Sequence, residues 1–370
     1  MSQSQLHGFT LGVAVASYRD EAHLARTLDA ADQALHEAGI APVARVLVAA
    51  EHSATAEKRA QERGWTYRRV LPGSPRTRAA AREAARRGAG GSATLVIDGD
   101  VALEPGLVGP ALAVLAEREG LAGVGGRIDE AHWRGGALVG TRSDVDGAGA
   151  GGPVTRMRDV ALWRREAVDA VGGYDPWLPS GDDEELAGRL RMAGYGAVTL
   201  DVRAGVRHGH ARDSRAEFVA RLRGGEMNGP GLVLRRARGT MAFGEHLRRS
   251  AGRLALLAWI GVGLVATIAG GAWGLGTIWA WGTAGLLAFF AVLRLSLPRA
   301  FWRGLTQAVE GVGIVRGLAV PVALPRVGAA PRPIAPAREP AAGAAAGAAS
   351  GEPQPHERDP DEPPPIVRRA

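Results

Sequence analysis

Thr94-Leu95-Val96-Ile97-Asp98-Gly99-Asp100 is the stretch that decides the fold of this 370-residue chain. The run from Thr94 to Ile97 predicts a buried strand that stops at Asp98. Asp-x-Asp at a strand end places two carboxylates near one point, and Gly99 allows a sharp turn between them. Mg²⁺ and Mn²⁺ prefer oxygen ligands and usually keep substrate phosphates in their shell. The stretch therefore predicts a site for a divalent cation and a diphosphate.

Strands and helices alternate on the N-terminal side of this stretch. The expected strands are 10–16, 43–49 and 66–70, and the expected helices are 21–38, 55–63 and 76–87. Such alternation implies an α/β domain with a mainly parallel sheet, helices on both faces, and ligands beyond the carboxyl ends of the strands. The loops 17–21, 51–53 and 98–100 lie at such ends, so we expect them to converge on one crevice.

A second acidic cluster, Gly181-Asp182-Asp183-Glu184-Glu185, follows the glycine-rich turn Gly172-Gly173-Tyr174-Asp175. Acidic residues are common in the first turn of a helix because they complement the helix dipole, which is one explanation. Four consecutive carboxylates exceed what a cap needs, and a metal or a basic substrate group would relieve their repulsion. A buried carboxylate here would have a raised pKa and could act as a general base.

Two further segments bear on the site. His208 lies in Arg-His-Gly-His, after a short strand expected at 197–202. Its neutral imidazole could complete the shell of a cation, and the alternatives are a surface histidine or a structural hydrogen bond. Residues 123–155 are rich in glycine, and we expect a loop region with short strands that is either a mobile lid, an acceptor surface or flexible filler.

The charge of the chain is carried almost entirely by arginine. The formal net charge is +7, and Lys58 is the only lysine. A coding bias explains this in part, and arginine also binds diphosphates and anionic head groups well. Nucleic-acid binding is not expected, because no helix-turn-helix, zinc or aromatic-rich RNA-binding signature occurs. The chain has no cysteine, which excludes disulfides and thiolate metal sites.

Residues 254–293 carry no charge and lie between Arg253 and Arg294. One span needs roughly 20 residues, so we expect a hairpin of two spans that turns at Gly270-Gly271. The positive-inside rule puts both arginines on the cytoplasmic side. A buried pair of soluble helices is the alternative. Three tryptophans fall near the outer turn, where an aromatic belt would lie: Trp273, Trp279 and Trp281.

Five segments follow from these patterns. They are a catalytic domain at 1–225, a basic juxtamembrane connector at 226–252, two transmembrane helices at 253–297, an interfacial or weak third membrane segment at 298–325, and a disordered Pro/Ala-rich tail at 326–370. Residues 1–10 lack the apolar core of a cleavable signal peptide. We therefore expect the catalytic domain on the cytoplasmic side of the inner (cytoplasmic) membrane.

Four motifs in this order resemble glycosyltransferase family 2 with the GT-A fold. The motifs are Val15-Ala16-Ser17-Tyr18-Arg19-Asp20-Glu21, Ile97-Asp98-Gly99-Asp100, Gly172-Gly173-Tyr174-Asp175 and Gly181-Asp182-Asp183. The resemblance covers about residues 10–225. It implies a membrane-anchored, hexosyltransferase-like enzyme that transfers a sugar with inversion from a nucleoside-diphosphate sugar. The acceptor would be lipid-linked or another glycan near the membrane.

The resemblance also implies roles for individual residues. Asp98 matches the family's nucleotide-side aspartate and Asp100 its metal ligand, for Mg²⁺ or Mn²⁺. His208 is the further candidate for the metal shell. Asp183 matches the base that activates the acceptor, with Asp182 beside it. The reaction implied is a single in-line displacement at the anomeric carbon.

The nucleobase side departs from the family pattern. Asp20 and Glu21 match the acidic pair that follows the first strand and lies near the nucleobase. The family usually has paired aspartates after the second strand, whereas here only Glu51 is acidic. The choice among UDP, GDP and dTDP is therefore open. Three arginines are candidates to assist the diphosphate without a firm assignment: Arg76, Arg78 and Arg82.

The Gln-x-x-Arg-Trp signature of processive members is missing, and Arg221-Leu222-Arg223-Gly224 occupies the expected region. We therefore expect transfer of one sugar rather than chain synthesis. One alternative is a non-catalytic member of the fold that binds nucleotide sugar or scaffolds a cell-envelope assembly, which the altered second motif favours. Another is a nucleotidyltransferase-like enzyme, which would show a Gly-rich, Arg/Lys-bearing loop where residues 17–21 stand.

Overall fold

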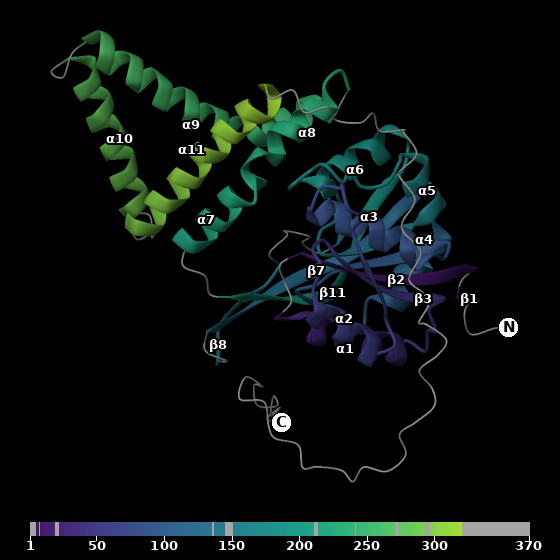
Figure 1. Cartoon of the computed structure of the whole chain (residues 1–370). Coiled ribbons are helices and arrows are strands. Elements are labelled where there is room, and N and C mark those ends of the chain that lie inside the picture. The colour runs from purple at the N-terminus through teal and green to yellow at the C-terminus, as the bar shows by residue number, and fades with distance from the viewer. Residues whose placement is uncertain are drawn as a thin grey trace.

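Strand β5 (Ala93–Asp98) lies in the middle of the sheet and carries the stretch that decides the fold. The structure is a computed structural model that describes residues 5–6, 8–18, 22–134, 137–144, 151–210, 214–240, 242–270, 274–292 and 297–319. Within these ranges an α/β domain is followed by a group of long helices (Figure 1). Asp20, Glu21, Trp273, Arg294 and the tail 326–370 lie outside the described residues.

The N-terminal half alternates as the sequence predicts. Its elements are β1 (Gln5–Leu6), β2 (Phe9–Ser17), α1 (Leu24–Glu37), β3 (Ala44–Ala49), α2 (Ala54–Glu62), β4 (Thr66–Arg69), α3 (Arg78–Ala89) and β5. Two of these helices begin at a side-chain cap: Ser53 Oγ accepts from the Ala56 N–H at 3.1 Å, and Thr77 Oγ1 accepts from the Ala80 N–H at 3.0 Å.

The C-terminal half of the domain is mixed. Its elements are β6 (Val101–Leu103), α4 (Val108–Glu117), β7 (Leu121–Arg134), β8 (Ala137–Arg142), β9 (Gly152–Pro153), β10 (Val160–Arg164), α5 (Arg165–Ala170), α6 (Asp182–Met192) and β11 (Gly196–His210). The sheet order is β4-β3-β2-β5-β10-β7-β11-β6, with β10 antiparallel to both β5 and β7. The expectation of a mainly parallel sheet therefore holds from β4 to β5, whereas beyond β5 the sheet is mixed: β7 and β11 are parallel, and β10 and β6 run antiparallel to their neighbours.

The glycine-rich segment is the clearest misreading of the sequence. Its first part is not loop but the 14-residue strand β7, which pairs in parallel with β11. A Cβ on Gly123 would lie 2.6 Å from the Trp163 ring, and one on Gly126 would lie 2.7 Å from the Val202 carbonyl oxygen. These glycines permit close packing rather than flexibility. The strand expected at 197–202 is also longer, so His208 lies within β11 and not after it.

Apolar side chains fill both faces of the sheet. One core joins α1 and α4 to the strands, and its buried residues include Leu24, Leu28, Leu95 and Leu112. The other lies under α3, α5 and α6 and contains Trp163, whose Nε1–H donates to the Tyr174 hydroxyl at 2.9 Å. Burial of a large apolar side chain stabilises the fold by roughly 1.5–3 kcal/mol, so these two cores hold the sheet edge rigid beneath the site.

The remaining elements are helical: α7 (Ser214–Arg223), η1 (Glu226–Asn228), α8 (Gly229–Ala237), α9 (Ala242–Gly270), α10 (Leu275–Val292) and α11 (Leu297–Ala319). Helices α9, α10 and α11 outline a triangle beside the α/β domain, and α11 returns to pack on α8 (Figure 1). The α8–α11 contact is backbone to backbone, because a Cβ on Gly231 of α8 would lie 2.3 Å from the Ile314 carbonyl oxygen of α11. The segment expected at 298–325 is thus largely one helix, docked on η1 and α8.

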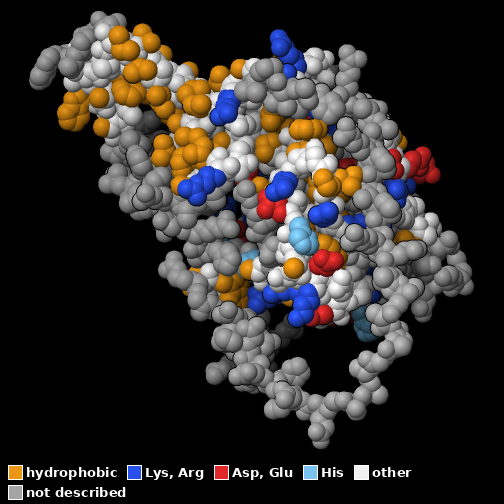
Figure 2. All heavy atoms as spheres, in the orientation of Figure 1, with side chains coloured by type: hydrophobic (Ala, Val, Ile, Leu, Met, Phe, Trp, Pro, Cys, Tyr) orange, Lys and Arg blue, Asp and Glu red, His pale blue; other side chains and the backbone are white. Residues whose placement is uncertain are grey.

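One helix among the described residues, Ala242–Ile268, is long and apolar enough to cross a membrane. It continues without a break through the expected boundary at 252/253. Its apolar side chains are exposed (Val265 by 65 % and Ile268 by 76 %), and hydrophobic side chains gather over α9 and α10 in Figure 2. Trp279 joins the two helices, since its Nε1–H donates to the Trp259 carbonyl oxygen at 3.1 Å. A second span in α10 stays a prediction.

Candidate active site

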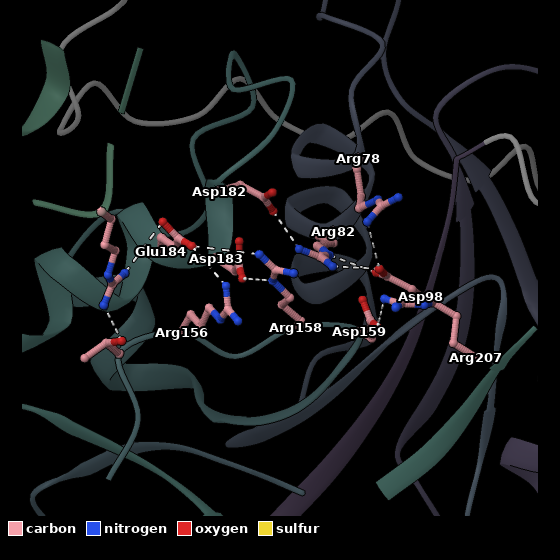
Figure 3. Close-up of polar contacts among 12 residues, drawn as sticks. Arg78, Arg82, Asp98, Arg156, Arg158, Asp159, Asp182, Asp183, Glu184 and Arg207 are labelled. Carbon is pink, nitrogen blue, oxygen red and sulfur yellow. Dashed lines mark hydrogen bonds and ion pairs between the residues drawn. The ribbon is translucent and has the colours of Figure 1, made fainter. Parts of the chain in front are cut away.

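Arg82 joins the two acidic clusters that the sequence singles out. It projects from α3, is 3 % exposed, and donates from Nε and Nη2 to the two carboxylate oxygens of Asp98 at 2.8 and 2.6 Å. Its Nη1–H donates to Asp182 Oδ2 at 2.8 Å (Figure 3). Asp98 ends β5 and Asp182 begins α6, so one guanidinium connects the end of a central strand to the start of a helix.

The charge of Asp98 is held in place by arginine. Burial alone would raise the pKa of this carboxyl, but Arg82 and Arg78 outweigh burial and hold the pKa below its usual range. Arg78 lies one helical turn from Arg82, with Nη1 at 3.7 Å from Asp98 Oδ2. A buried arginine with two carboxylate partners stays charged, so Arg82 is a fixed cation between Asp98 and Asp182.

Asp183 is the carboxylate best suited to accept a proton. It is buried, and Arg158 donates to it, with Nε 3.3 Å from Oδ2. Burial and the adjacent Asp182 raise the pKa of Asp183 to about 6, and Arg158 limits the rise. A carboxylate with such a pKa is ionised at neutral pH and still basic enough to take a proton in a reaction.

The four consecutive carboxylates of α6 are separated by the chain's own arginines. Asp182 pairs with Arg82 and Asp183 with Arg158. Glu184 lies among three arginines, and Glu185 accepts from Arg189 at 2.7 and 2.6 Å. Arginines of the chain thus already offset the repulsion for which the sequence suggested a metal or a basic substrate group. Gly181, at a φ of 76°, turns the chain so that the helix begins at Asp182.

Asp100 and His208 lie beside each other across the edge of the sheet. The His208 N–H donates to the Asp100 carbonyl oxygen at 2.8 Å, and the His208 ring stacks on His23 with centroids 5.7 Å apart. Neither His208 ring nitrogen, both of them buried, has a hydrogen-bond partner among the described residues. Burial, with Arg26 and His23, lowers the pKa of His208 to about 4, so the imidazole is neutral.

These two residues fit a divalent cation only in part. A neutral imidazole with unpartnered nitrogens is a competent ligand. The described part of the chain contains no group of three or more His, Asp or Glu side chains placed to hold a metal. Mg²⁺ and Mn²⁺ commonly take one or two protein ligands and complete their shell with substrate phosphates, which is compatible with this pair.

Glu51 is separate from the buried carboxylates. It is exposed in the loop between β3 and α2, at the carboxyl edge of the sheet but two strands away from β5. Asp20 and Glu21, the other residues expected near the nucleobase, lie outside the described residues. The structure thus brings Asp98, Asp100, Asp182 and Asp183 to one edge and leaves Glu51 apart from them.

The Gly172-Gly173-Tyr174-Asp175 motif is a brace for the site. The Tyr174 N–H donates to Glu83 on α3 at 2.9 Å, and a Cβ on Gly173 would lie 2.4 Å from the same carboxylate. Asp175 accepts from Arg236 on α8, with Nε at 2.7 Å from Oδ2. The motif therefore fixes the loop that precedes Asp182 to a helix on either side.

A cavity of about 690 Å³ opens between the α/β domain and the C-terminal helices, and Arg158, which contacts Asp183, is part of its lining. Arg156, Arg158, Gly181 and Glu184 line it on the domain side. The helical side contributes Arg221 from α7, His246, Arg249, Ser250 and Arg253 from α9, and Glu310 from α11. The cavity is large enough for a substrate fragment and reaches the start of the uncharged stretch at Leu254.

Sequence reasoning missed the arginines that organise the site. Arg82 was one of three unassigned candidates, and its i,i+4 spacing from Arg78 on one helix is the signal that they share a face. Arg156 and Arg158 flank Met157 just before β10, and nothing in their local sequence marks them. Their partners are 25 to 28 residues away, so only the fold brings them together.

This mixed α/β sheet, with an Asp-x-Asp turn after β5 and an acidic start to α6, is the fold of a GT-A glycosyltransferase. The sequence matches the family described as "Glycosyltransferase like family 2" over residues 7–229, more than half of the chain. The chain belongs to this family and is a glycosyltransferase. The fold class predicted from the sequence is therefore confirmed.

Comparison with solved structures found similar chains at low sequence identity. A mannosyltransferase from Pyrobaculum calidifontis, PcManGT, in complex with GDP-Man and Mn²⁺, is 19% identical with a TM-score of 0.51, covering 84% of this chain and 87% of that chain. Glucosyl-3-phosphoglycerate synthase from Mycobacterium tuberculosis, in complex with Mn²⁺, UDP and glucosyl-3-phosphoglycerate, is 16% identical with a TM-score of 0.41, covering 60% and 78%. No curated protein matches the sequence.

Proposed function

We propose that the enzyme transfers one sugar, with inversion, from a nucleoside-diphosphate sugar to a lipid-linked or membrane-proximal acceptor. The observation that carries this proposal is the position of Asp183: buried, with a pKa of about 6, between the Asp98–Arg82–Asp182 group and the cavity lined by Gly181 and Glu184. The donor would lie on the Asp98 side and the acceptor in the cavity. The GDP-Man complex of PcManGT makes a nucleotide-sugar donor reasonable for a chain of this fold.

In this mechanism Asp183 takes the proton of an acceptor hydroxyl as its oxygen attacks the anomeric carbon. The bond from that carbon to the diphosphate breaks on the opposite side, which inverts the configuration. Arg158 orients the Asp183 carboxylate and keeps it ionised between turnovers. Because the pKa of Asp183 is about 6, the proton returns to solvent at neutral pH.

Asp100 and His208 would hold a divalent cation, Mg²⁺ or Mn²⁺, together with the donor phosphates. Such a cation supplies charge neutralisation for the departing diphosphate. Asp98, fixed by Arg82, would accept hydrogen bonds from the nucleoside, and Glu51, Asp20 and Glu21 would contact the nucleobase side. Arg78, which is half-exposed beside Asp98, is the arginine placed to meet a phosphate oxygen.

The proposed place of work is the cytoplasmic face of the inner membrane. Arg253 and the arginines of α9 before it flank the apolar helix on one side, which is the pattern of the positive-inside rule. We further propose that residues 1–225 form the catalytic domain, that 226–252 connect it to the membrane, and that 253–297 span it twice. The tail 326–370 is proposed to stay disordered.

The deciding experiment is a screen of detergent-solubilised protein against UDP, GDP and dTDP sugars, with and without Mn²⁺. Metal-dependent release of nucleoside diphosphate from one donor supports the proposal and names the sugar. Two variants separate the half-reactions: Asp183→Asn keeps donor binding and loses transfer, whereas Asp100→Asn loses Mn²⁺-dependent donor binding. Failure of every donor to bind would overturn the proposal, and full transfer by Asp183→Asn would overturn the role of the base.

A further inference from the structure

The lining of the cavity next to Arg158 carries more arginines than carboxylates. Five arginines line it, against two glutamates, Glu184 and Glu310. Three further carboxylates contact these arginines from outside the lining: Asp183 contacts Arg158, Glu245 contacts Arg249 and Glu226 contacts Arg221. A cavity meant for a neutral sugar acceptor would need hydrogen-bonding groups of both kinds, not several guanidinium groups. The lining therefore favours an anion.

The guanidinium groups are accessible to a ligand, unlike Arg82. The side chains of Arg156, Arg158, Arg249 and Arg253 are 35 %, 38 %, 31 % and 35 % exposed. All four are ion-paired with a glutamate, and part of each side chain is nevertheless exposed. Three of them converge on Glu184, with nitrogens 3.4 Å (Arg156), 3.8 Å (Arg158) and 3.6 Å (Arg249) from its oxygens.

The cavity also lies where the apolar surface of α9 begins. Arg249, Ser250 and Arg253 line it, and Leu254 starts the uncharged stretch in the next residue. An acceptor with an anionic group and an apolar chain would meet arginine in the cavity and exposed apolar side chains along α9. A phosphate matches the cavity better than a carboxylate, since its oxygens can accept from several arginines at once.

We propose that this cavity is the acceptor site and that it binds a phosphate group of the acceptor through Arg156, Arg158 and Arg249. This inference rests on the proposed function, because it assigns the cavity to the acceptor of the same reaction. The phosphate is held as an anchor, and the attacking hydroxyl of the same acceptor is left to Asp183. Arg158 contacts both the cavity and Asp183, so it places the anchored acceptor beside the base.

The test is calorimetric titration of the detergent-solubilised full chain with hexyl phosphate, hexanol and inorganic phosphate. No divalent cation is added, so that the donor site does not retain phosphate through a metal. We expect hexyl phosphate to bind and hexanol not to bind. In the Arg156→Gln/Arg249→Gln variant the affinity for hexyl phosphate falls by about 100-fold, roughly tenfold for each guanidinium removed. Arg248→Gln, an exposed neighbour on α9 outside the lining, leaves the affinity unchanged.

The probes distinguish two sources of phosphate. Hexyl phosphate binding at least tenfold tighter than inorganic phosphate points to a lipid-borne acceptor, and equal affinities point to a small phosphorylated one. The proposal is overturned if hexanol binds as well as hexyl phosphate, or if the Gln pair binds hexyl phosphate like wild type. It is also overturned if Arg156→Lys/Arg249→Lys, which keeps both charges, loses as much affinity as the Gln pair.

The proposed function is tested separately on the same variants. Mn²⁺-dependent donor binding reports on the Asp98 and Asp100 side, which the cavity variants leave intact. Retained donor binding in the Gln pair also shows that the variant is folded. Phosphate binding without binding of any donor would refute the transferase proposal while leaving the anion site in place.

Discussion

Arg82 holds together two carboxylates that lie 84 positions apart in the chain, Asp98 and Asp182. Such a buried group is stable only while all its partners are present, because a lone buried charge is strongly destabilising. We expect Arg82→Leu to lower the free energy of unfolding by about 3–5 kcal/mol, measured by urea denaturation. Arg78→Gln, at a side chain 43 % exposed, is the control and should change it by less than about 1 kcal/mol. Equal, small effects would contradict the bridging role.

Asp183 predicts the pH dependence of the reaction. Its pKa is raised to about 6, so below that pH the base is protonated and inactive, and kcat/KM should rise with pH through about 6 to a plateau. Because Arg158 lowers this pKa, Arg158→Gln should move the rising limb to higher pH. Steady-state kinetics between pH 4.5 and 8.5 measure both profiles. A limb that stays in place in Arg158→Gln would assign the titration to another group.

At the residue scale, the sequence identifies the acidic side of the site and not its basic side. Asp98, Asp100, Asp182 and Asp183 are recognisable because each lies in a short local motif next to a strand or helix end. Arg82, Arg158 and Arg249 act through partners far away in the chain, and arginine is too common here to stand out. The sequence therefore predicts the carboxylates of the candidate site, and only the fold reveals the arginines that pair with them.

At the scale of elements, the docking of α11 depends on its glycines. Gly313 and Gly317 face η1 and α8, where added Cβ atoms would lie 2.1 Å from the Met227 oxygen and 2.8 Å from the Asn228 oxygen. We expect Gly313→Leu to detach α11 and expose the α8 face, seen as faster amide hydrogen exchange in α8 and α11. Gly304→Ala on the same helix, where a Cβ meets nothing within 4 Å, is the control. Unchanged exchange in Gly313→Leu would contradict this packing.

Whether a helix or strand can be predicted from the sequence depends on whether its residues repeat at a regular spacing. Helix α1 is predictable because Leu24, Leu28, Ala31 and Leu35 repeat at helical spacing and are all buried. Strand β7 is not predictable, because its glycines lower strand propensity. Gly123 is needed there because it packs against Trp163, which is 40 residues away in the chain. Local periodicity thus predicts elements whose apolar residues repeat at regular spacing. It fails where a large side chain, such as Trp163, can pack only against glycines that have no side chain.

At the scale of the whole molecule, the exposed apolar surface of α9 predicts membrane attachment. We expect the wild-type protein to remain in the membrane pellet after alkaline carbonate extraction. Val265→Arg, at a position 65 % exposed within the candidate span, should shift a fraction to the supernatant, since a central arginine costs roughly 2.5–3.5 kcal/mol on insertion. Leu247→Arg, near the start of α9, is the matched control. Complete extraction of the wild type would refute the prediction.

The α/β domain and the C-terminal helices both contribute to the cavity lining, which matters for any truncation made to obtain a soluble protein. Arg249 and Arg253 belong to α9 and Glu310 to α11, so a fragment ending near residue 225 keeps the Asp98–Arg82–Asp182 group and discards a third of the cavity lining. We expect such a fragment to hydrolyse its nucleotide-sugar donor in a screen and to fail to bind the acceptor. For the same reason, a chimera that joins the C-terminal helices of one relative to the α/β domain of another should have the acceptor specificity of the relative that supplied the helices.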